Sequence, residues 1–399
     1  MILRNCNVVD VREGTIRPNV SIRVEGKIIQ SITPGSPTSG ELTKDLSGAY
    51  VLPGLINAHV HLYVLSPIQA INPHENPAET ALRCYSHASD ALKAGVTTVR
   101  TVGELNRVDI ALRSMITKGW VQGPRIVSAG RGVTPTGGHG AGLATEADGP
   151  DGFRRAARED FAAGADHIKL FVSGGIANIH DSRESLTEPQ ATLQEMEAAV
   201  SVASSKGTYV CAHATGSEIV EMAAEAGVRS FEHCYELNKD AVDAIRSVNG
   251  FLVPTLSVTS LPPEYRRKRG FSESTIDKMS AARPKHLESV RAAVRAGVKV
   301  VVGTDTPPGN TSEDVNVTVK ETEFLVEAGM SPLEAVRSAT LNAAELIMME
   351  DRLGLVEPRY QADLVAMPSN PLEDIKNLRK IAFVMYDGQI IRDDLRPSD

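Results

Sequence analysis

The sequence predicts an α/β fold, a TIM-type (β/α)8 barrel with a small β-sandwich domain built from both termini. The first observation is a recurring pattern, a small residue followed by glycine and then by β-branched or other apolar residues. It occurs at 93–103, 162–175, 225–235 and 295–305. In each case a helix ends, glycine supplies the left-handed cap, and a buried strand begins.

The second observation is the number of strands between residue 53 and residue 353. Helical patterns with apolar residues at three- and four-residue spacing, such as 191–207 and 217–227, precede most of them. Strand–helix units repeated over roughly 300 residues match the size of this barrel. A doubly wound open sheet is the alternative, but no GxGxxG fingerprint follows an early strand. The predicted strands end near His61, Gly103, Gly130, Ser173, His213, His233, Thr255 and Asp305.

The third observation is that both ends of the chain lack this repeat. Residues 1–52 contain short alternating runs such as SIRVEGKIIQSI, and residues 354–399 contain ADLVAMPSNP and IAFVMYDGQII. Each flank is too short to bury a core alone, so we expect them to pair into one β-sandwich beside the barrel of residues 53–353. Within the barrel, the charged segment 261–270 is interpreted as solvated surface, with a substrate lid as the alternative.

Composition favours small-molecule chemistry. The formal net charge of -8 offers no basic surface for nucleic acid, and no stretch approaches the roughly 18 apolar residues of a membrane span. The 4 cysteines are scattered without CxxC spacing, which favours a reducing compartment. We therefore expect a cytoplasmic homo-oligomer that binds neither nucleic acid nor membrane.

Titratable residues gather at the predicted strand ends, where barrels of this type form their sites. Imidazole and carboxylate groups contributed by separate strands suit a borderline divalent metal such as zinc. Histidines in isolation often pack as ordinary core residues, so the weight of the prediction lies in their convergence. The candidate residues are His59, His61, Lys169, His213, His233 and Asp305.

Five segments in this order resemble the metal motifs of the amidohydrolase superfamily: VLPGLINAHVHL, HIKLFVSGG, CAHATG, FEHCYE and VVGTDTP. The resemblance covers essentially the whole chain and is strongest to the binuclear branch of Xaa-Pro dipeptidases and imidazolonepropionase-related amidohydrolases. It implies two divalent metal ions, with zinc expected. One ion would be held by His59, His61 and Asp305, and the other by His213 and His233.

The same resemblance implies that Lys169 bridges the two metals as a carbamate formed with CO2. A lysine reacts with CO2 only as the neutral amine, which requires a depressed pKa. An ion pair between Lys169 and a nearby carboxylate is the alternative. Metals placed so would generate a hydroxide that attacks an amide carbonyl. Asp305 would accept its proton and deliver it to the departing nitrogen.

Substrate contacts are predicted on loops near the site. His139, in the motif TPTGGHGAG, is expected to hydrogen bond the substrate carbonyl, and TGGHG resembles the dipeptidase-like branch. The resemblance also implies that Tyr235 binds the substrate's carboxylate. His180 is either a substrate contact or a loop residue. His87 and His286 lie in helical patterns and are interpreted as structural.

Two departures from the family pattern shape the functional prediction. Asn57 stands where the family usually has Asp, and Gly216 stands where deaminase branches place an acid or amide. The second departure argues against a ring deaminase. We expect a dipeptidase or carboxypeptidase that acts on Xaa-Pro or Xaa-hydrophobic dipeptides or on N-acyl amino acids. The alternatives are a hydrolase of cyclic or xenobiotic amides and a noncatalytic assembly protein.

Overall fold

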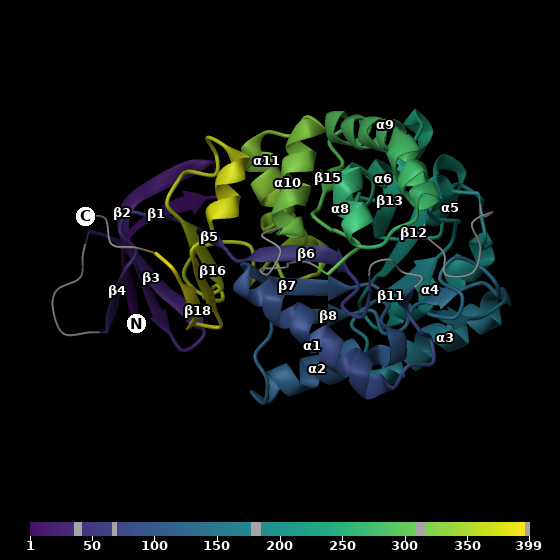
Figure 1. The fold of residues 1–399 in the computed structure, drawn as a ribbon, viewed down its shortest axis with the longest axis horizontal. Coiled ribbons are helices and arrows are strands. Elements are labelled where there is room, and N and C mark those ends of the chain that lie inside the picture. Colours follow the sequence, from purple (N-terminus) through teal and green to yellow (C-terminus); the bar gives the residue numbers. More distant parts are fainter. Residues whose placement is uncertain (36–41, 66–69, 177–184, 308–315, 396–399) are drawn as a thin grey trace.

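The computed structural model places a strand-rich part, which carries both ends of the chain, beside a larger part of mixed helices and strands (Figure 1). No helix in the described part of the chain is long and apolar enough to cross a membrane. The structure describes residues 1–35, 42–65, 70–176, 185–307 and 316–395.

The larger part contains the predicted succession of parallel strands. Parallel ladders join β6 to β8 and β11 to β15. The Asp166 amide donates to the Ser128 carbonyl at 2.7 Å, and the Ala58 amide donates to the Val302 carbonyl at 2.8 Å, so hydrogen bonds link the two ladders at both ends. This arrangement confirms the α/β parallel architecture and is consistent with a (β/α)8 barrel. The strands are β6 (Leu55–Val60), β7 (Val96–Thr101), β8 (Arg125–Ser128), β11 (Ile168–Phe171), β12 (Val210–Gly216), β13 (Ser230–Glu236), β14 (Phe251–Val253) and β15 (Lys299–Val300), with β9 (Val133–Thr134) and β10 (Thr145–Glu146) as short additions.

Helices alternate with these strands, and the glycine pattern marks where they end. Gly95, Gly164, Gly227 and Gly297 have φ angles of 94°, 108°, 90° and 76°, the left-handed region that glycine enters without steric cost. The helices are α1 (Pro77–Lys93), α2 (Val108–Thr117), α3 (Gly149–Ala163), α4 (Leu193–Ser205), α5 (Ser217–Glu225), α6 (Lys239–Ser247), α7 (Ser257–Ser260), α8 (Pro263–Lys268), α9 (Glu273–Arg295), α10 (Val317–Glu327), α11 (Pro332–Ser338) and α12 (Leu341–Leu346), with 3-10 turns at Leu105–Arg107 and Ile375–Lys380.

Strands from the two ends of the chain form one sheet, in the order β18-β17-β16-β5-β1-β2-β3, with β4 beside β1. The two ends meet where β16 pairs antiparallel with β5, and side chains from both form a separate apolar core. The predicted pairing of the ends is therefore present, while the sandwich description and the boundaries at 52 and 354 stay predictions. The strands are β1 (Ile2–Asp10), β2 (Thr15–Glu25), β3 (Ile28–Pro34), β4 (Thr43–Asp45), β5 (Tyr50–Pro53), β16 (Leu364–Met367), β17 (Phe383–Tyr386) and β18 (Gln389–Asp393).

A charged cluster joins this sheet to the parallel strands. Arg125, the first residue of β8, donates to Asp363 at 2.6 Å and to Asp387 at 3.1 Å. The Asp363 side chain is only 5% exposed, so its charge depends on the arginine for compensation. The Asp387 amide also donates to Asp363 at 2.8 Å.

We expect the change Arg125→Met to lower the free energy of unfolding by about 3 kcal/mol, because it leaves the buried Asp363 carboxylate without its cation. Urea titration measures the effect. Arg154→Met, which breaks the exposed pair with Asp151, is the control and should change stability by less than about 1 kcal/mol. Equal losses in the two variants would contradict a special role for Arg125.

Candidate metal centre

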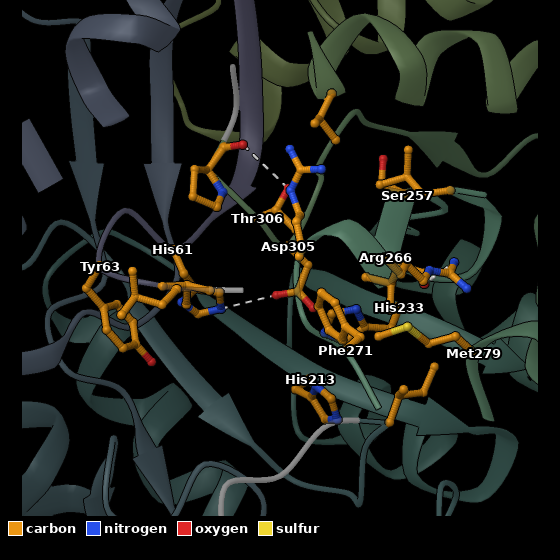
Figure 2. Close-up of a pocket in the computed structure, with 18 of the residues that line it drawn as sticks. His61, Tyr63, His213, His233, Ser257, Arg266, Phe271, Met279, Asp305 and Thr306 are labelled. Carbon is orange, nitrogen blue, oxygen red and sulfur yellow. Dashed lines mark hydrogen bonds and ion pairs between the residues drawn. The ribbon is translucent and has the colours of Figure 1, made fainter. Parts of the chain in front are cut away.

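The strand ends bring the predicted ligands together around one cavity of about 450 Å³. His61, Lys169, His213, His233 and Asp305 line it, and the fully buried His59 contacts Asp305. In Figure 2 the side chains of His61, His213, His233 and Asp305 point toward a common centre. The convergence predicted from the sequence is therefore present in the structure.

Asp305 contacts two of the histidines directly. Its Oδ1 lies 3.2 Å from Nε2 of His59 and 3.3 Å from Nε2 of His61. One ligand atom each of His59, His233 and Asp305 lies within 4.8 Å of the others. The ring centroids of His213 and His233 are 4.5 Å apart. These spacings fit metal coordination, in which ligand atoms surround an ion at about 2.0–2.2 Å.

Each of the four histidines has one ring nitrogen engaged outside the centre. Such an outer partner fixes the ring orientation and leaves the other nitrogen for a metal. The partners are Glu232 Oε2 for His59 Nδ1 at 2.6 Å, the Gly103 carbonyl for His61 Nδ1 at 2.8 Å, the Gly174 carbonyl for His213 Nε2 at 3.0 Å, and Thr255 Oγ1 for His233 Nδ1 at 2.7 Å.

Lys169 is fully buried, and its Nζ has no hydrogen-bond partner among the described residues. The alternative of a lysine paired with a carboxylate is therefore not what the described residues show. Burial lowers the pKa of Lys169, and the nearby Arg100 charge lowers it further. A buried amine with a lowered pKa, beside four imidazoles and a carboxylate, fits the implied pair of divalent metals and a lysine carbamate.

A buried ion pair stands behind the centre. Arg100 on β7 donates to Glu232 at 2.8 Å and to Ser230 at 3.2 Å, and both charged side chains are fully buried. Burial alone would raise the pKa of Glu232, but Arg100 and the hydrogen bond from His59 hold that pKa well below its usual range. Glu232 is therefore a charged acceptor for His59. Neither residue was predicted from the sequence, although a charge inside an apolar strand was the available signal.

Left-handed backbone turns the chain at the strand ends. His233, Thr255 and Asp305 have φ angles of 71°, 53° and 56°, and Cys234 has 53°. Non-glycine residues rarely adopt this region, and such residues cluster at functional sites. The backbone therefore bends within β13 at His233 and Cys234, directly before Tyr235.

Two of the three predicted substrate contacts line the cavity. His139 lines the cavity and stacks on His213 with ring centroids 4.3 Å apart. Tyr235 also lines it, with its ring 5.6 Å from that of His233 and edge-on to His286 at 4.7 Å. His87, expected to be structural, reaches the cavity wall as well. His180 lies outside the described residues.

The charged segment 261–270 has two faces. Glu264, Arg267 and Lys268 are exposed, as the solvated-surface interpretation expects. Tyr265 and Arg266 line the cavity, so α8 also forms part of its wall. A charge run read as one stretch did not reveal this division, because the division depends on the helical turn of α8.

This chain belongs to the amidohydrolase family, whose model matches residues 50–391. It is therefore a hydrolase. The cluster of histidines and Asp305 lies at the carboxyl ends of the parallel strands, where enzymes with a (β/α)8 barrel form their active sites.

Individual relatives align with most of the length of this chain. Ochratoxinase of Aspergillus niger is 29% identical over 358 residues, which cover 82% of this chain and 72% of that protein. A Xaa-Pro dipeptidase solved with bound methionine in its active site is 33% identical, with a TM-score of 0.89 over 98% of this chain and 99% of that chain. A prolidase solved with N-methylphosphonate-L-proline is 28% identical, with a TM-score of 0.90 over the same shares.

We expect Glu232→Gln to weaken metal binding by about 10- to 100-fold, because a neutral amide is a poorer acceptor for His59 than a carboxylate. Metal content after dialysis against graded chelator concentrations measures the change. Glu218→Gln, at an exposed position of α5, is the matched control and should bind metal as the unmodified protein does. Unchanged metal retention in Glu232→Gln would contradict the role given to Glu232.

Proposed function

We propose that this enzyme hydrolyses an amide C–N bond, as a dipeptidase or carboxypeptidase acting on Xaa-Pro or Xaa-hydrophobic dipeptides or on N-acyl amino acids. The observation that carries the proposal is the convergence of four histidines, one aspartate and a buried lysine at a single cavity. Imidazole and carboxylate donors at this spacing suit zinc or a similar divalent ion.

In this proposal two divalent metals occupy the centre. His59, His61 and Asp305 would hold one, His213 and His233 the other, and Lys169 would bridge them after its amine takes up CO2 as a carbamate. When bound, such metals lower the pKa of water and polarise a carbonyl. The outer hydrogen bonds of the histidines keep the required ring nitrogens unprotonated.

Asp305 and His139 supply the chemistry of the chain itself. The Asp305 carboxylate accepts a proton from the attacking water and returns it to the leaving nitrogen, as amide cleavage requires. Burial would raise the pKa of Asp305, but the neighbouring His59 and His61 rings hold that pKa well below the usual range, so the group begins as the base. His139 stacks on His213, and in this proposal it hydrogen bonds the substrate carbonyl and stabilises the developing oxyanion.

The apolar residues of the cavity wall favour a substrate that contains an apolar amino acid. Ile176, Phe271 and Met279 line the cavity and belong to one apolar cluster with Tyr235. The printed names of the prolidase and the Xaa-Pro dipeptidase point to proline-containing dipeptides. Similarity to ochratoxinase favours a second candidate, a xenobiotic amide. A cytoplasmic location and a homo-oligomeric state stay predictions.

We expect the purified enzyme, loaded with Zn²⁺ or Mn²⁺, to hydrolyse Xaa-Pro or Xaa-hydrophobic dipeptides or N-acyl amino acids faster than cyclic amides. The reason is that the metal cluster and the apolar wall share one cavity. A library screen with ninhydrin detection of the released amine, and ring-opening assays for cyclic amides, measures the preference. Chelator treatment is the control and should remove activity. Preferred hydrolysis of cyclic amides would overturn the dipeptidase assignment.

Lys169→Ala should reduce metal-dependent hydrolysis by more than about 100-fold, because the bridging group is lost. Initial rates at saturating metal measure the loss, and intact-protein mass spectrometry of the unmodified enzyme should detect the mass of one added CO2. The exposed Lys206→Ala variant on the same protein serves as the control. Full activity in Lys169→Ala would rule out the carbamate.

A further inference from the structure

One buried carboxyl group beside the centre, that of Glu104, is not used by the chemistry described above. Glu104 follows the end of β7 and is fully buried. Its Oε1 accepts from the Leu62 amide at 2.6 Å, and its Oε2 accepts from the Tyr63 amide at 3.0 Å. These two amides directly follow His61, so Glu104 binds the backbone next to a predicted metal ligand.

The Glu104 contacts continue the pairing of β6 with β7 beyond the point where the ladder stops. The last pair of that ladder is Val60 with Thr101. Past it, Nδ1 of His61 bonds to the Gly103 carbonyl at 2.8 Å, and Glu104 then takes the next two amides. Side chains therefore replace the ladder at the position where the first metal would bind.

Helix α1 holds the same segment from its carbonyl side. Nδ1 of His87 donates to the Leu62 carbonyl and Nε of Arg83 donates to the Tyr63 carbonyl, each at 2.7 Å. Arg83 is itself fixed by Glu75, which accepts from its Nη1 at 3.1 Å. All four backbone polar groups of Leu62 and Tyr63 are thus bonded to side chains.

This segment determines what faces the cavity on one side of the centre. Nε2 of His61 lies 3.3 Å from Asp305, and the Tyr63 ring stands edge-on to the His61 ring with centroids 5.9 Å apart. Figure 2 shows Tyr63 beside His61 on the same side of Asp305. A ligand must be held within about 0.5 Å of its productive position, and a chain end without ladder bonds does not provide that precision alone.

The two bonds of Glu104 need both of its oxygens. A carboxyl group can accept through both oxygens, whereas the amide of glutamine has one oxygen and a nitrogen that only donates. Burial and the neighbouring Asp109 charge raise the pKa of Glu104, so the group is costly to keep in this place. Its bonds to the two amides offset that cost, because a buried amide without a partner is also unfavourable.

We propose that Glu104 is a positioning residue for the metal held by His59, His61 and Asp305: it fixes the backbone of Leu62 and Tyr63 and thereby the place of the His61 ring. The inference rests on the two-metal centre of the proposed function. It assigns to Glu104 a role at one of the two ions only, since His213 and His233 are held by other partners.

Metal retention tests the proposal. We expect Glu104→Gln to release one of two Zn²⁺ ions per chain at a chelator concentration about 10- to 100-fold lower than the unmodified protein, and to retain the other ion normally. The visible absorption of the Co²⁺-loaded protein should also change, because the orientation of one ligand changes.

Glu195→Gln is the matched control. Glu195, on α4, is buried, and its two oxygens accept from the Gly149 amide at 2.7 Å and the Thr192 amide at 2.8 Å, neither of which belongs to a residue that lines the cavity. Urea titration should show loss of stability in both variants, whereas metal retention and the Co²⁺ spectrum should change only in Glu104→Gln.

A double-mutant cycle identifies the ion that Glu104 serves. In a His61→Ala background the first ion has already lost a ligand, so adding Glu104→Gln should change retention of the remaining ion by less than about 2-fold. In a His213→Ala background Glu104→Gln should keep its full effect on the ion bound by His61. Equal effects in the two backgrounds would contradict the assignment to the first ion.

Two results would overturn the proposal. One is a folded Glu104→Gln variant that retains both ions as the unmodified protein does. The other is a Glu195→Gln variant that loses metal as readily as Glu104→Gln. If Glu104→Gln does not fold, as judged by circular dichroism, Arg83→Met decides, because it frees the Tyr63 carbonyl of the same segment and should weaken the same ion about 10-fold. Unchanged retention in Arg83→Met would then overturn the proposal. These measurements use no substrate, so a protein that binds metal but cleaves no dipeptide refutes the proposed function alone.

Discussion

The buried ion pair between Arg100 and Glu232 is the interaction on which the centre depends. It joins β7 to β13 inside the parallel strands, and the second oxygen of Glu232 accepts a hydrogen bond from His59. A buried carboxylate without a cation would take up a proton and would become a weaker acceptor for His59. Arg100 keeps Glu232 charged, Glu232 holds His59, and His59 meets Asp305 at the other end of its ring. A continuous series of contacts thus connects the buried charge of Arg100 with Asp305 at the strand ends.

Backbone hydrogen bonds also fix the position of Asp305 relative to His59. The amides of Thr304 and Asp305 both donate to the His59 carbonyl, at 3.0 Å and 2.9 Å, so the loop after β15 is attached to the end of β6. The left-handed conformation at Asp305 then turns its carboxylate toward His59 and His61. First and last strands of the succession therefore meet at the same group that is proposed to move protons. A rigid strand framework provides the precision that a loop alone would lack.

The sequence predicted the parallel strand succession and the candidate ligands because both leave local signals. Glycine before an apolar run marks a helix end, and histidines at strand ends are visible one by one. Arg100 and Glu232 lie 132 positions apart, so their pairing leaves no local signal. The division of α8 into an exposed face and a cavity wall is equally invisible, because Arg266 and Arg267 are adjacent in sequence and differ only in direction. What the sequence omits is the outer support of the centre and the charge of its wall.

Asn57 illustrates how that outer support works. Its Nδ2 donates to the hydroxyls of Thr304 and Thr318, each at 2.9 Å, while its Oδ1 accepts from the His59 amide at 3.2 Å. Thr304 is thereby left to donate to the Thr306 carbonyl, at 3.2 Å, on the far side of Asp305. An aspartate at this position has no donor, so Thr304 would have to donate to it and would lose Thr306. The amide therefore sets the direction of the hydrogen bonds in the loop that carries Asp305. In this chain asparagine supports the loop of the proposed base rather than the ring of a histidine.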